Sequence, residues 1–279
     1  MFYRPLYLVI IFIVFQVNLN AFWGLYFKNK TIRSNLAQID TPPKNSGLDS
    51  IDCIYYVNLD RRPEKLKYIQ NFLHENRLQG TRVHAVDGSF LSEKTISKLL
   101  GKKSYPLMTP GGIGCALSHY SIWQHAYDHG YNRIWIIEDD VEALSPVSGL
   151  TAILDELEKA DPYWDVLYTD RDTRDWNGNT HIRDCSPWLK HPAVGIDDPH
   201  YYLWKANISD TLIKIHMRDG TYSMILSKAG IKKILKNHVK NNVWAPCDHS
   251  IHVITDINQY AIKYPLVTHA VENRISDTD

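Results

Sequence analysis

The feature that most constrains the fold of this chain is an alternation of short apolar strands with amphipathic helices. Strands are expected at Ile54–Val57, Arg82–Val86, Ile134–Ile137 and Asp165–Thr169. Helices are expected between them because apolar residues there recur at helical spacing, as at Leu66, Ile69 and Phe72. This alternation predicts an α/β fold with a mainly parallel central sheet that is flanked by helices. Ligands of such sheets bind beyond the carboxyl ends of the strands.

Three adjacent carboxylates, Glu138, Asp139 and Asp140, follow the strand Ile134–Ile137. Like charges that close repel one another, so this run has no stabilising role by itself. A divalent cation such as Mg²⁺ or Mn²⁺ takes carboxylate oxygens and would remove the repulsion. Because side chains alternate along an extended segment, we expect Glu138 and Asp140 on one side as metal ligands and Asp139 on the other. A solvated acidic turn is the alternative.

Other polar side chains follow the remaining strands. Asn58 and Asp87 each come directly after a strand and are expected at the same edge of the sheet as the acidic run. Asp170-Arg171-Asp172 is a rival acidic motif with the same spacing. Because Arg171 stands between its two carboxylates, a salt-bridged turn is favoured there.

Asp248 is a candidate general base, with His249 and His252 close behind it. Either histidine could complete a metal shell, since imidazole is a common metal ligand. A surface turn after Pro246 is the alternative interpretation of this cluster.

Charge balance and short motifs exclude several classes of protein. Lys and Arg total 31, as do Asp and Glu, so the chain lacks the basic excess of a nucleic-acid-binding protein. No Gly-Lys-Ser follows the run Gly111–Gly114, which excludes a Walker phosphate loop. The absence of HExxH and GxSxG motifs argues against peptidase and esterase chemistry. The cysteines form no CxxC pair, so a structural zinc site is not expected.

The chain is expected to have three segments: a signal anchor over 1–27, a stem or linker over 28–50, and a folded domain over 51–279. The uncharged stretch Leu6–Phe27 is long enough for a single membrane span, and a cleaved signal peptide is the alternative. Basic residues after the stretch mildly favour a domain on the cytoplasmic face of a bacterial membrane. Glycosylation sequons at Asn29 and Asn207 would matter only in a Golgi or ER lumen.

Short motifs along the domain occur in a fixed order. They are Val57–Arg62, Ala85–Gly88, Gly114–His119, Glu138–Asp140, Gly220–Tyr222, Ser227–Gly230, Pro246–Asp248 and Ser276–Thr278. In this order they resemble the motifs of glycosyltransferase family 25, which includes bacterial lipopolysaccharide glycosyltransferases and collagen galactosyltransferases. Each motif is short, and the ordered set carries the resemblance.

The resemblance implies a GT-A-like nucleotide-sugar-binding domain, a UDP-sugar donor, dependence on Mn²⁺ or Mg²⁺, and inversion at the sugar carbon. On this hypothesis Glu138 and Asp140 hold the metal, and Asp248 takes the proton from the acceptor hydroxyl. The residues expected to bind the nucleotide sugar are Asn58, Arg61, Asp87, Ser118, His119 and Asp139.

Two departures from the family pattern bear on the acceptor and the base. Cys247 stands before Asp248, where many relatives have an apolar residue, commonly Val. The segment Arg171–Lys214 matches no pattern of the family, so a glycan, a lipid-linked sugar such as lipopolysaccharide, or a protein remains open as acceptor. Galactose and glucose are the expected transferred hexoses.

Two other functions stay open at this point. A membrane-tethered member without catalytic activity would bind a sugar or nucleotide sugar and not turn it over. A metal-dependent phosphoesterase would use the same carboxylates around two metal ions, but it usually needs more His and Asp ligands at separate strand ends.

Overall fold

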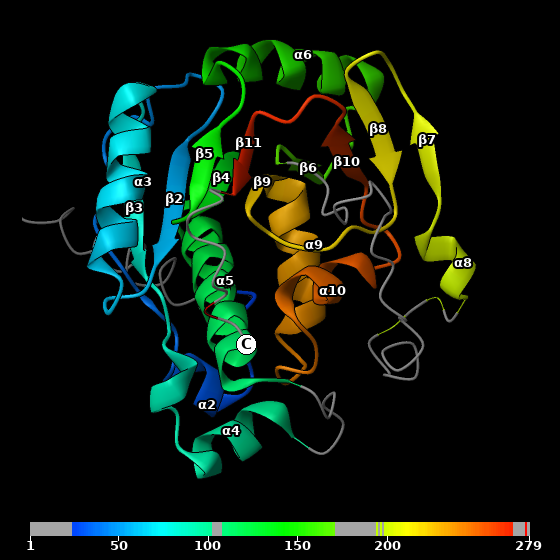
Figure 1. Cartoon of the computed structure of the whole chain (residues 1–279). Coiled ribbons are helices and arrows are strands. Elements are labelled where there is room, and N and C mark those ends of the chain that lie inside the picture. Colours follow the sequence, from blue (N-terminus) through cyan, green and yellow to red (C-terminus); the bar gives the residue numbers. More distant parts are fainter. Residues whose placement is uncertain are drawn as a thin grey trace, which may run out of the picture.

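A nine-stranded sheet forms the centre of the molecule in the computed structural model (Figure 1). The structure describes residues 24–101, 108–170, 194, 196, 198–269 and 277. The strands lie in the order β1 (Gln38–Ile39), β3 (Gly80–His84), β2 (Cys53–Asn58), β4 (Arg133–Glu138), β9 (Ser223–Ser227), β6 (Val166–Tyr168), β10 (Gln259–Ile262), β8 (Leu212–Ile215) and β7 (Lys205–Asn207). The expected α/β class is confirmed.

The sheet is mixed, which corrects the prediction of a mainly parallel one. Strand β2 is parallel to β3 and β4, and β10 is parallel to β6. Strand β9 lies between β4 and β6 and is antiparallel to both. The edge strands β1 and β7, and β8 beside β7, also join by antiparallel pairs. An apolar run fits a buried strand in either direction, so the sequence of β9 does not encode its orientation.

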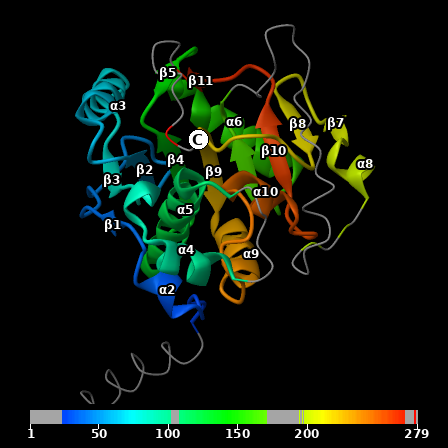
Figure 2. The same ribbon diagram turned by 60° about the horizontal axis from the view of Figure 1, so that its bottom comes forward.

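Helices cover both faces of the sheet (Figures 1 and 2). Helices α5 (Pro110–His129) and α9 (Lys228–His238) pack on one face, and α3 (Pro63–Glu75) and α6 (Leu150–Ala160) on the other. Strand β4 supplies both faces by alternation: Ile134 and Ile136 join the core under α5, whereas Trp135 and Ile137 join the core under α6. All four side chains are fully buried.

Helix α5 is fixed closely against the end of β3. Its first residue is Pro110, and the Thr109 side chain caps it by accepting from the amide of Gly112. A Cβ atom added at Gly114 would lie 2.2 Å from the carbonyl oxygen of Val86. Only glycine therefore permits this approach of α5 to the turn after β3, which brings residues of both into one site.

Shorter elements complete the fold around this centre. They are α2 (Lys30–Arg33), η1 (Gly88–Phe90), α4 (Glu93–Leu100), η2 (Val147–Gly149), α8 (Pro199–Tyr202), α10 (Cys247–His252) and a two-stranded sheet of β5 (Val141–Ala143) with β11 (Val267–His269). The β5–β11 pair directly follows the acidic run in the chain and is antiparallel.

Part of the segment that was predicted as a stem packs on the domain. Ile32 of this segment is buried. Phe27, the last residue of the predicted membrane segment, is also buried, and its ring stacks on Tyr120 of α5 with the centroids 5.0 Å apart. Strand β1, which lies within the predicted stem, pairs with β3 of the domain. Most of the predicted membrane segment, residues 1–23, lies outside the described residues. Among the residues that are described, no helix is long and apolar enough to cross a membrane.

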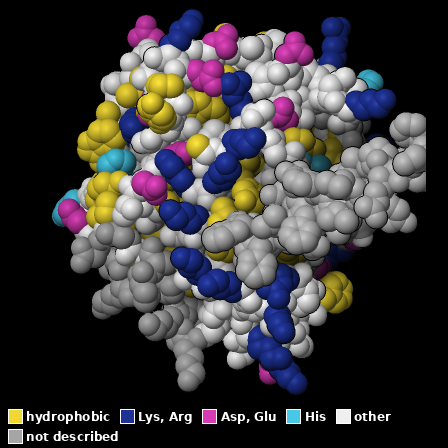
Figure 3. Space-filling model, turned by 180° about the vertical axis from the view of Figure 1, so that it is seen from behind, with side chains coloured by type: hydrophobic (Ala, Val, Ile, Leu, Met, Phe, Trp, Pro, Cys, Tyr) yellow, Lys and Arg dark blue, Asp and Glu magenta, His cyan; other side chains and the backbone are white. Residues whose placement is uncertain are grey.

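The net charge of zero is distributed unevenly over the surface. Figure 3 shows the face opposite to that of Figure 1, where Lys and Arg side chains gather in a band and Asp and Glu side chains are scattered. Two buried acidic residues, Asp139 and Asp170, lie beyond the ends of β4 and β6, and a third, Asp165, lies at the start of β6.

Candidate active site

The acidic run lies at the carboxyl end of β4, as expected, but its side chains divide differently. Strand β4 ends at Glu138, and Asp139 and Asp140 form a turn. The Nζ atom of Lys65 in α3 lies 3.3 Å from Asp140 Oδ2 and 3.8 Å from Asp139 Oδ1. The prediction that Asp139 faces away from Asp140 is therefore wrong, because the alternation of an extended strand stops before them.

Lys65 contacts several carboxylates near the start of α3. Its side chain is only 3% exposed, and Nζ also lies 3.1 Å from Asp277 Oδ2. Asp277 in turn pairs with Arg62 at 2.7 Å and with Arg61 at 3.0 Å. The last residue that the structure describes therefore returns to the first turn of α3 and the acidic run.

Arg61 and Asp87, both predicted to line a nucleotide pocket, contact each other. Arg61 Nε donates to Asp87 Oδ2 at 2.7 Å, and the Arg61 side chain remains 45% exposed. Asp87 also accepts from the amide and hydroxyl of Ser89. The structure thus brings the ends of β2 and β3 together at the surface beside the acidic run.

Asn58 and Ser118 are buried and use their polar atoms on the protein. Asn58 Nδ2 donates to Asp139 Oδ2 at 2.6 Å, and its Oδ1 accepts from Arg82. The Ser118 hydroxyl accepts from the amide of Val86 at 2.9 Å and donates to the Gly114 carbonyl at 2.8 Å. Both side chains therefore hold the edges of the site in place.

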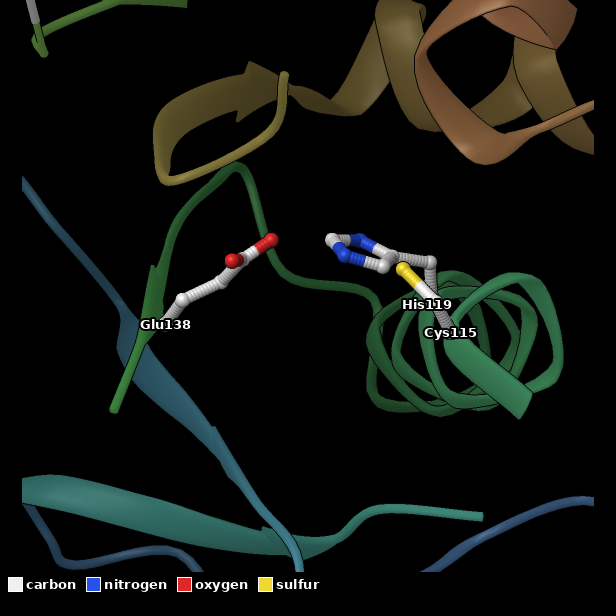
Figure 4. Close-up of side chains that lie close together, drawn as sticks. All are labelled: Cys115, His119 and Glu138. Carbon is white, nitrogen blue, oxygen red and sulfur yellow. The ribbon is translucent and has the colours of Figure 1, made fainter. Parts of the chain in front are cut away.

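Glu138 extends from β4 toward α5, where it meets His119 and Cys115 (Figure 4). One ligand atom from each of these three residues lies within 4.8 Å of one from each of the others. The hydroxyl of Thr221 donates to Glu138 Oε1 at 3.0 Å and lies 3.4 Å from His119 Nε2. The amide of Glu138 donates to the Tyr222 carbonyl.

Burial determines the protonation of this centre. Burial, and next the charge of Asp140, raises the pKa of Glu138 to about 8. Burial raises the pKa of Asp139 to about 6, although the bond from Asn58 and the charge of Lys65 oppose the shift. Burial lowers the pKa of His119 to about 4, so its imidazole is neutral at pH 7. The carboxylates are in surroundings that favour an added positive charge.

Asp248, the predicted base, lies in the first turn of α10. Its Oδ2 accepts from the amide of Gly220 and its Oδ1 from the amide of His249, both at 2.8 Å. Burial raises its pKa, but His249 and the bond from Gly220 more than offset this and hold the pKa below its usual value. Asp248 is therefore ionised at neutral pH and able to accept a proton.

A second group of residues could hold a divalent ion. Asp219, Asp248 and His249 have ligand atoms that all lie within 4.8 Å of one another. Carboxylate oxygens with one imidazole suit Mn²⁺ as well as Zn²⁺. Asp248 therefore belongs to a possible ligand group as well as being a candidate base.

A buried ion pair supports the segment that presents Asp219, Gly220 and Thr221. Arg218 contacts both oxygens of Asp170, at 2.8 and 2.6 Å, and each side chain is only 1% exposed. Asp170 follows β6, as expected for its motif. Arg171 and Asp172, the other members of that motif, lie outside the described residues.

Sequence reasoning assigned no role to several residues of the site, although two of them, Cys115 and Thr221, lie in motifs of the family resemblance. The others are Lys65, Arg218 and Asp219. For Lys65 a signal exists: it precedes Ile69 and Phe72 by four and seven positions, on the helix face that is buried. A lysine on that face needs a partner, which predicts nearby carboxylates.

The acidic turn fits a divalent cation. Asp140 Oδ1 is buried and accepts no hydrogen bond within the described part of the chain. A buried carboxylate oxygen is normally paired, so an oxygen left unpaired beside a second carboxylate is suited to coordination. The charge of Asp140 raises the pKa of Glu138, and a cation near both carboxylates would relieve their repulsion.

Comparisons with known proteins identify the family of this chain. A family model described as glycosyltransferase family 25 (LPS biosynthesis protein) matches residues 51–251. The chain is similar to the probable inactive glycosyltransferase 25 family member 3 of Bos taurus, with 32% identity over 79% of this chain and 34% of that protein. It is also similar to procollagen galactosyltransferase 2 of Homo sapiens, with 32% identity over 48% of this chain and 23% of that protein. The chain thus spans about a third or less of these relatives.

Proposed function

The chain belongs to glycosyltransferase family 25, and we propose that it transfers a hexose, galactose or glucose, from a UDP-sugar to an acceptor hydroxyl with inversion. One observation carries the proposal: the paired carboxylates after β4 lie against Lys65 of α3, which shares Asp277 with Arg61 and Arg62. This arrangement suits a nucleoside diphosphate that is bound together with a divalent cation. The acceptor is a glycan, a lipid-linked sugar or a protein.

The basic residues at the start of α3 would bind the diphosphate of the donor. Arg61, Arg62 and Lys65 now share the carboxylate of Asp277. A diphosphate offers the same kind of charged acceptor, and Arg side chains bind phosphate by paired hydrogen bonds. The donor would therefore compete with or rearrange the contacts of Asp277.

Glu138 and Asp140 would hold Mn²⁺ or Mg²⁺, with Asp139 beside them. The fit rests on the unpaired Oδ1 of Asp140 and on the raised pKa values of Glu138 and Asp139. When bound, the cation would neutralise negative charge on the departing UDP. Asn58 fixes Asp139 through its 2.6 Å hydrogen bond, so the Asp139 carboxylate is held in place before the donor arrives.

Asp248 would act as the base of the transfer. Its carboxylate takes the proton of the acceptor hydroxyl while the hydroxyl oxygen forms a bond to the anomeric carbon. The bond from that carbon to the UDP oxygen breaks with its electron pair, and UDP carries the negative charge away. The two backbone hydrogen bonds to Asp248 orient the carboxylate for this step.

A non-catalytic nucleotide-sugar-binding role is the second candidate. One observation favours this role: a protein named as probably inactive is similar to this chain over 79% of the chain's length. Such a protein would keep the donor site and lack turnover. The phosphoesterase alternative has no comparable support from the family match.

The test is UDP release from a panel of UDP-hexoses by the full chain, with Mn²⁺ or with EDTA, and with simple glycan acceptors added. The proposed transferase releases UDP from one hexose donor, depends on the metal, and is stimulated by an acceptor. Binding of a UDP-hexose without release, under all these conditions, would favour the non-catalytic role.

A further inference from the structure

The side chains of Cys115, His119 and Glu138 form a compact group that the proposed transfer does not use as a unit (Figure 4). We propose that these three residues bind a thiophilic divalent cation, for which Zn²⁺ is the probe, at a site beside the carboxylates of the acidic turn. The proposal does not depend on catalytic activity, because it concerns the chain's own ligands.

The fold brings the ligands together from two elements. Cys115 and His119 are four residues apart in α5, so they lie one turn apart on the same side of the helix. Glu138 ends β4 and points toward them across the space between strand and helix (Figure 4). Both elements are rigid and buried, and a site on such elements is held more precisely than one on loops.

The ligand types are those of a zinc site. Thiolate, imidazole and carboxylate all coordinate Zn²⁺, and a site with three protein ligands leaves the fourth position open. A thiolate and a carboxylate would together balance the charge of the ion, and the imidazole of His119 is already neutral. The soft sulfur ligand favours Zn²⁺ over Mg²⁺ or Mn²⁺.

An independent observation points to a missing partner at this place. The Nδ1 atom of His119 is buried and has no hydrogen-bond partner among the residues that the structure describes. The side chain is fully buried, so bulk water does not satisfy this atom. Buried ring nitrogens are normally paired, and a coordinated ion would satisfy one of them.

The distances require only a small closure. The three ligand atoms lie within 4.8 Å of one another. Metal–ligand bonds of about 2.0–2.3 Å place tetrahedral ligands roughly 3.3–3.7 Å apart. The long side chain of Glu138 can supply this movement. Thr221, which donates to Glu138 and contacts His119, would orient both ligands from outside the site.

The site differs from the other cation positions by its sulfur. Asp139, Asp140 and Asp219 offer only oxygen. Glu138 is shared with the proposed Mn²⁺ site, so an ion at Cys115 would draw Glu138 away from Asp140. Zn²⁺ is therefore expected to compete with Mn²⁺ for this carboxylate.

The test uses Co²⁺ as a spectroscopic substitute for Zn²⁺ on the full chain. Binding should produce the near-ultraviolet charge-transfer absorption of a Co²⁺–thiolate bond, with one ion per chain, and added Zn²⁺ should abolish it. Cys115→Ser should remove the absorption. Thr221→Val should keep it and weaken Zn²⁺ binding by about tenfold, as loss of an outer hydrogen bond to metal ligands does.

Matched variants identify the sulfur. Cys53→Ala removes a buried free thiol whose Sγ lies 3.5 Å from Thr81 Oγ1 in the core between β2 and β3, and it should retain the absorption. Cys247→Ala and Cys185→Ala should also retain it. If circular dichroism shows that Cys115→Ser does not fold, His119→Gln is tested in its place. This variant is expected to lose tight Zn²⁺ binding.

Three results would overturn the proposal. The first is the absence of a Co²⁺–thiolate absorption in the folded wild-type chain. The second is an absorption that survives Cys115→Ser, and the third is one that disappears in Cys185→Ala or Cys247→Ala while Cys115 is intact. None of these depends on glycosyl transfer, so failure of the proposed function would leave this test unaffected.

Discussion

Asp248 is the residue whose replacement separates the alternative roles in the site most sharply. Its carboxylate accepts two backbone hydrogen bonds and belongs to the Asp219–Asp248–His249 group. If Asp248 is the base, Asp248→Asn should slow transfer by a factor on the order of 10² or more, as loss of a general base does. The affinities for UDP and Mn²⁺ should be nearly unchanged. Transfer rates and Mn²⁺ binding isotherms measure the two effects separately.

The opposite pattern would assign Asp248 to metal binding. A loss of Mn²⁺ affinity in Asp248→Asn, together with the loss of transfer, would mean that Asp219, Asp248 and His249 form the metal site. Asp155→Asn is the control, because this exposed carboxylate of α6 lies outside every group described above.

Removing one member of the Asp170–Arg218 pair, while the other keeps its charge, should strongly destabilise the fold. Each side chain is 1% exposed, so Asp170→Asn leaves a buried guanidinium without its counter-charge. Removing one partner of such a pair costs about 3–5 kcal/mol. Urea denaturation should show this loss, and the double variant Asp170→Leu with Arg218→Met should recover much of it. Equal instability of the single and double variants would contradict this account.

His238 should make the stability of the chain depend on pH. Burial lowers its pKa from 6.5 to about 4 in the folded state. Between these values the unfolded chain binds the proton and the folded chain does not, so stability is lost as pH falls from about 6.5 toward 4. The full effect is about 3 kcal/mol. The free energy of unfolding at pH 7 and pH 5 should differ less in His238→Asn than in the wild type.

At the scale of the residue, the sequence predicted where the acidic run lies but not how it is arranged. Glu138 and Asp140 come at the end of a strand, as expected. The turn at Asp139 rotates two carboxylates toward Lys65, and a pattern of alternation cannot show where a strand stops. The contact of Lys65 with Asp277 joins positions 212 residues apart, which only the folded chain reveals.

At the scale of the element, the close approach of α5 to the turn after β3 is the feature that assembles the site. Gly114→Ala would place a Cβ atom 2.2 Å from Val86 O, which neither rigid element can avoid. Overpacking of this kind costs about 1–3 kcal/mol. Thermal unfolding should show that loss, whereas Gly149→Ala, where no atom lies within 4 Å of the added Cβ, should be nearly neutral. Equal effects of the two changes would refute the close-approach argument.

Elements in the first half of the domain were easier to predict than those in the second half. Strands β2, β4 and β6 fall where apolar runs predicted them, because a strand that is buried on both faces is apolar throughout. Strand β3 is only half-buried and begins two residues before the predicted Arg82–Val86. Strands β7 and β8 were missed, since they lie at the sheet edge and mix apolar with charged residues. The direction of β9 depends on where the preceding segment returns to the sheet.

At the scale of the whole molecule, the site belongs to a sheet that is extended on both sides by antiparallel strands. The parallel strands β2, β3 and β4 carry the nucleotide-side residues at their ends. The antiparallel strand β9 is preceded by the Arg218–Tyr222 segment, which closes the site from the opposite direction. A purely parallel sheet would not bring Asp219 and Thr221 to the same edge.

The central claim is that the carboxylates after β4 and the basic start of α3 bind a UDP-sugar together with a divalent cation. The most direct measurement is the affinity of the full chain for UDP by calorimetry, with Mn²⁺ and with EDTA, for the wild type, Asp140→Asn and Asp155→Asn. The account predicts binding that requires Mn²⁺, is weakened about 10- to 100-fold in Asp140→Asn, and is unchanged in Asp155→Asn. UDP binding that is indifferent to both EDTA and Asp140→Asn would contradict it.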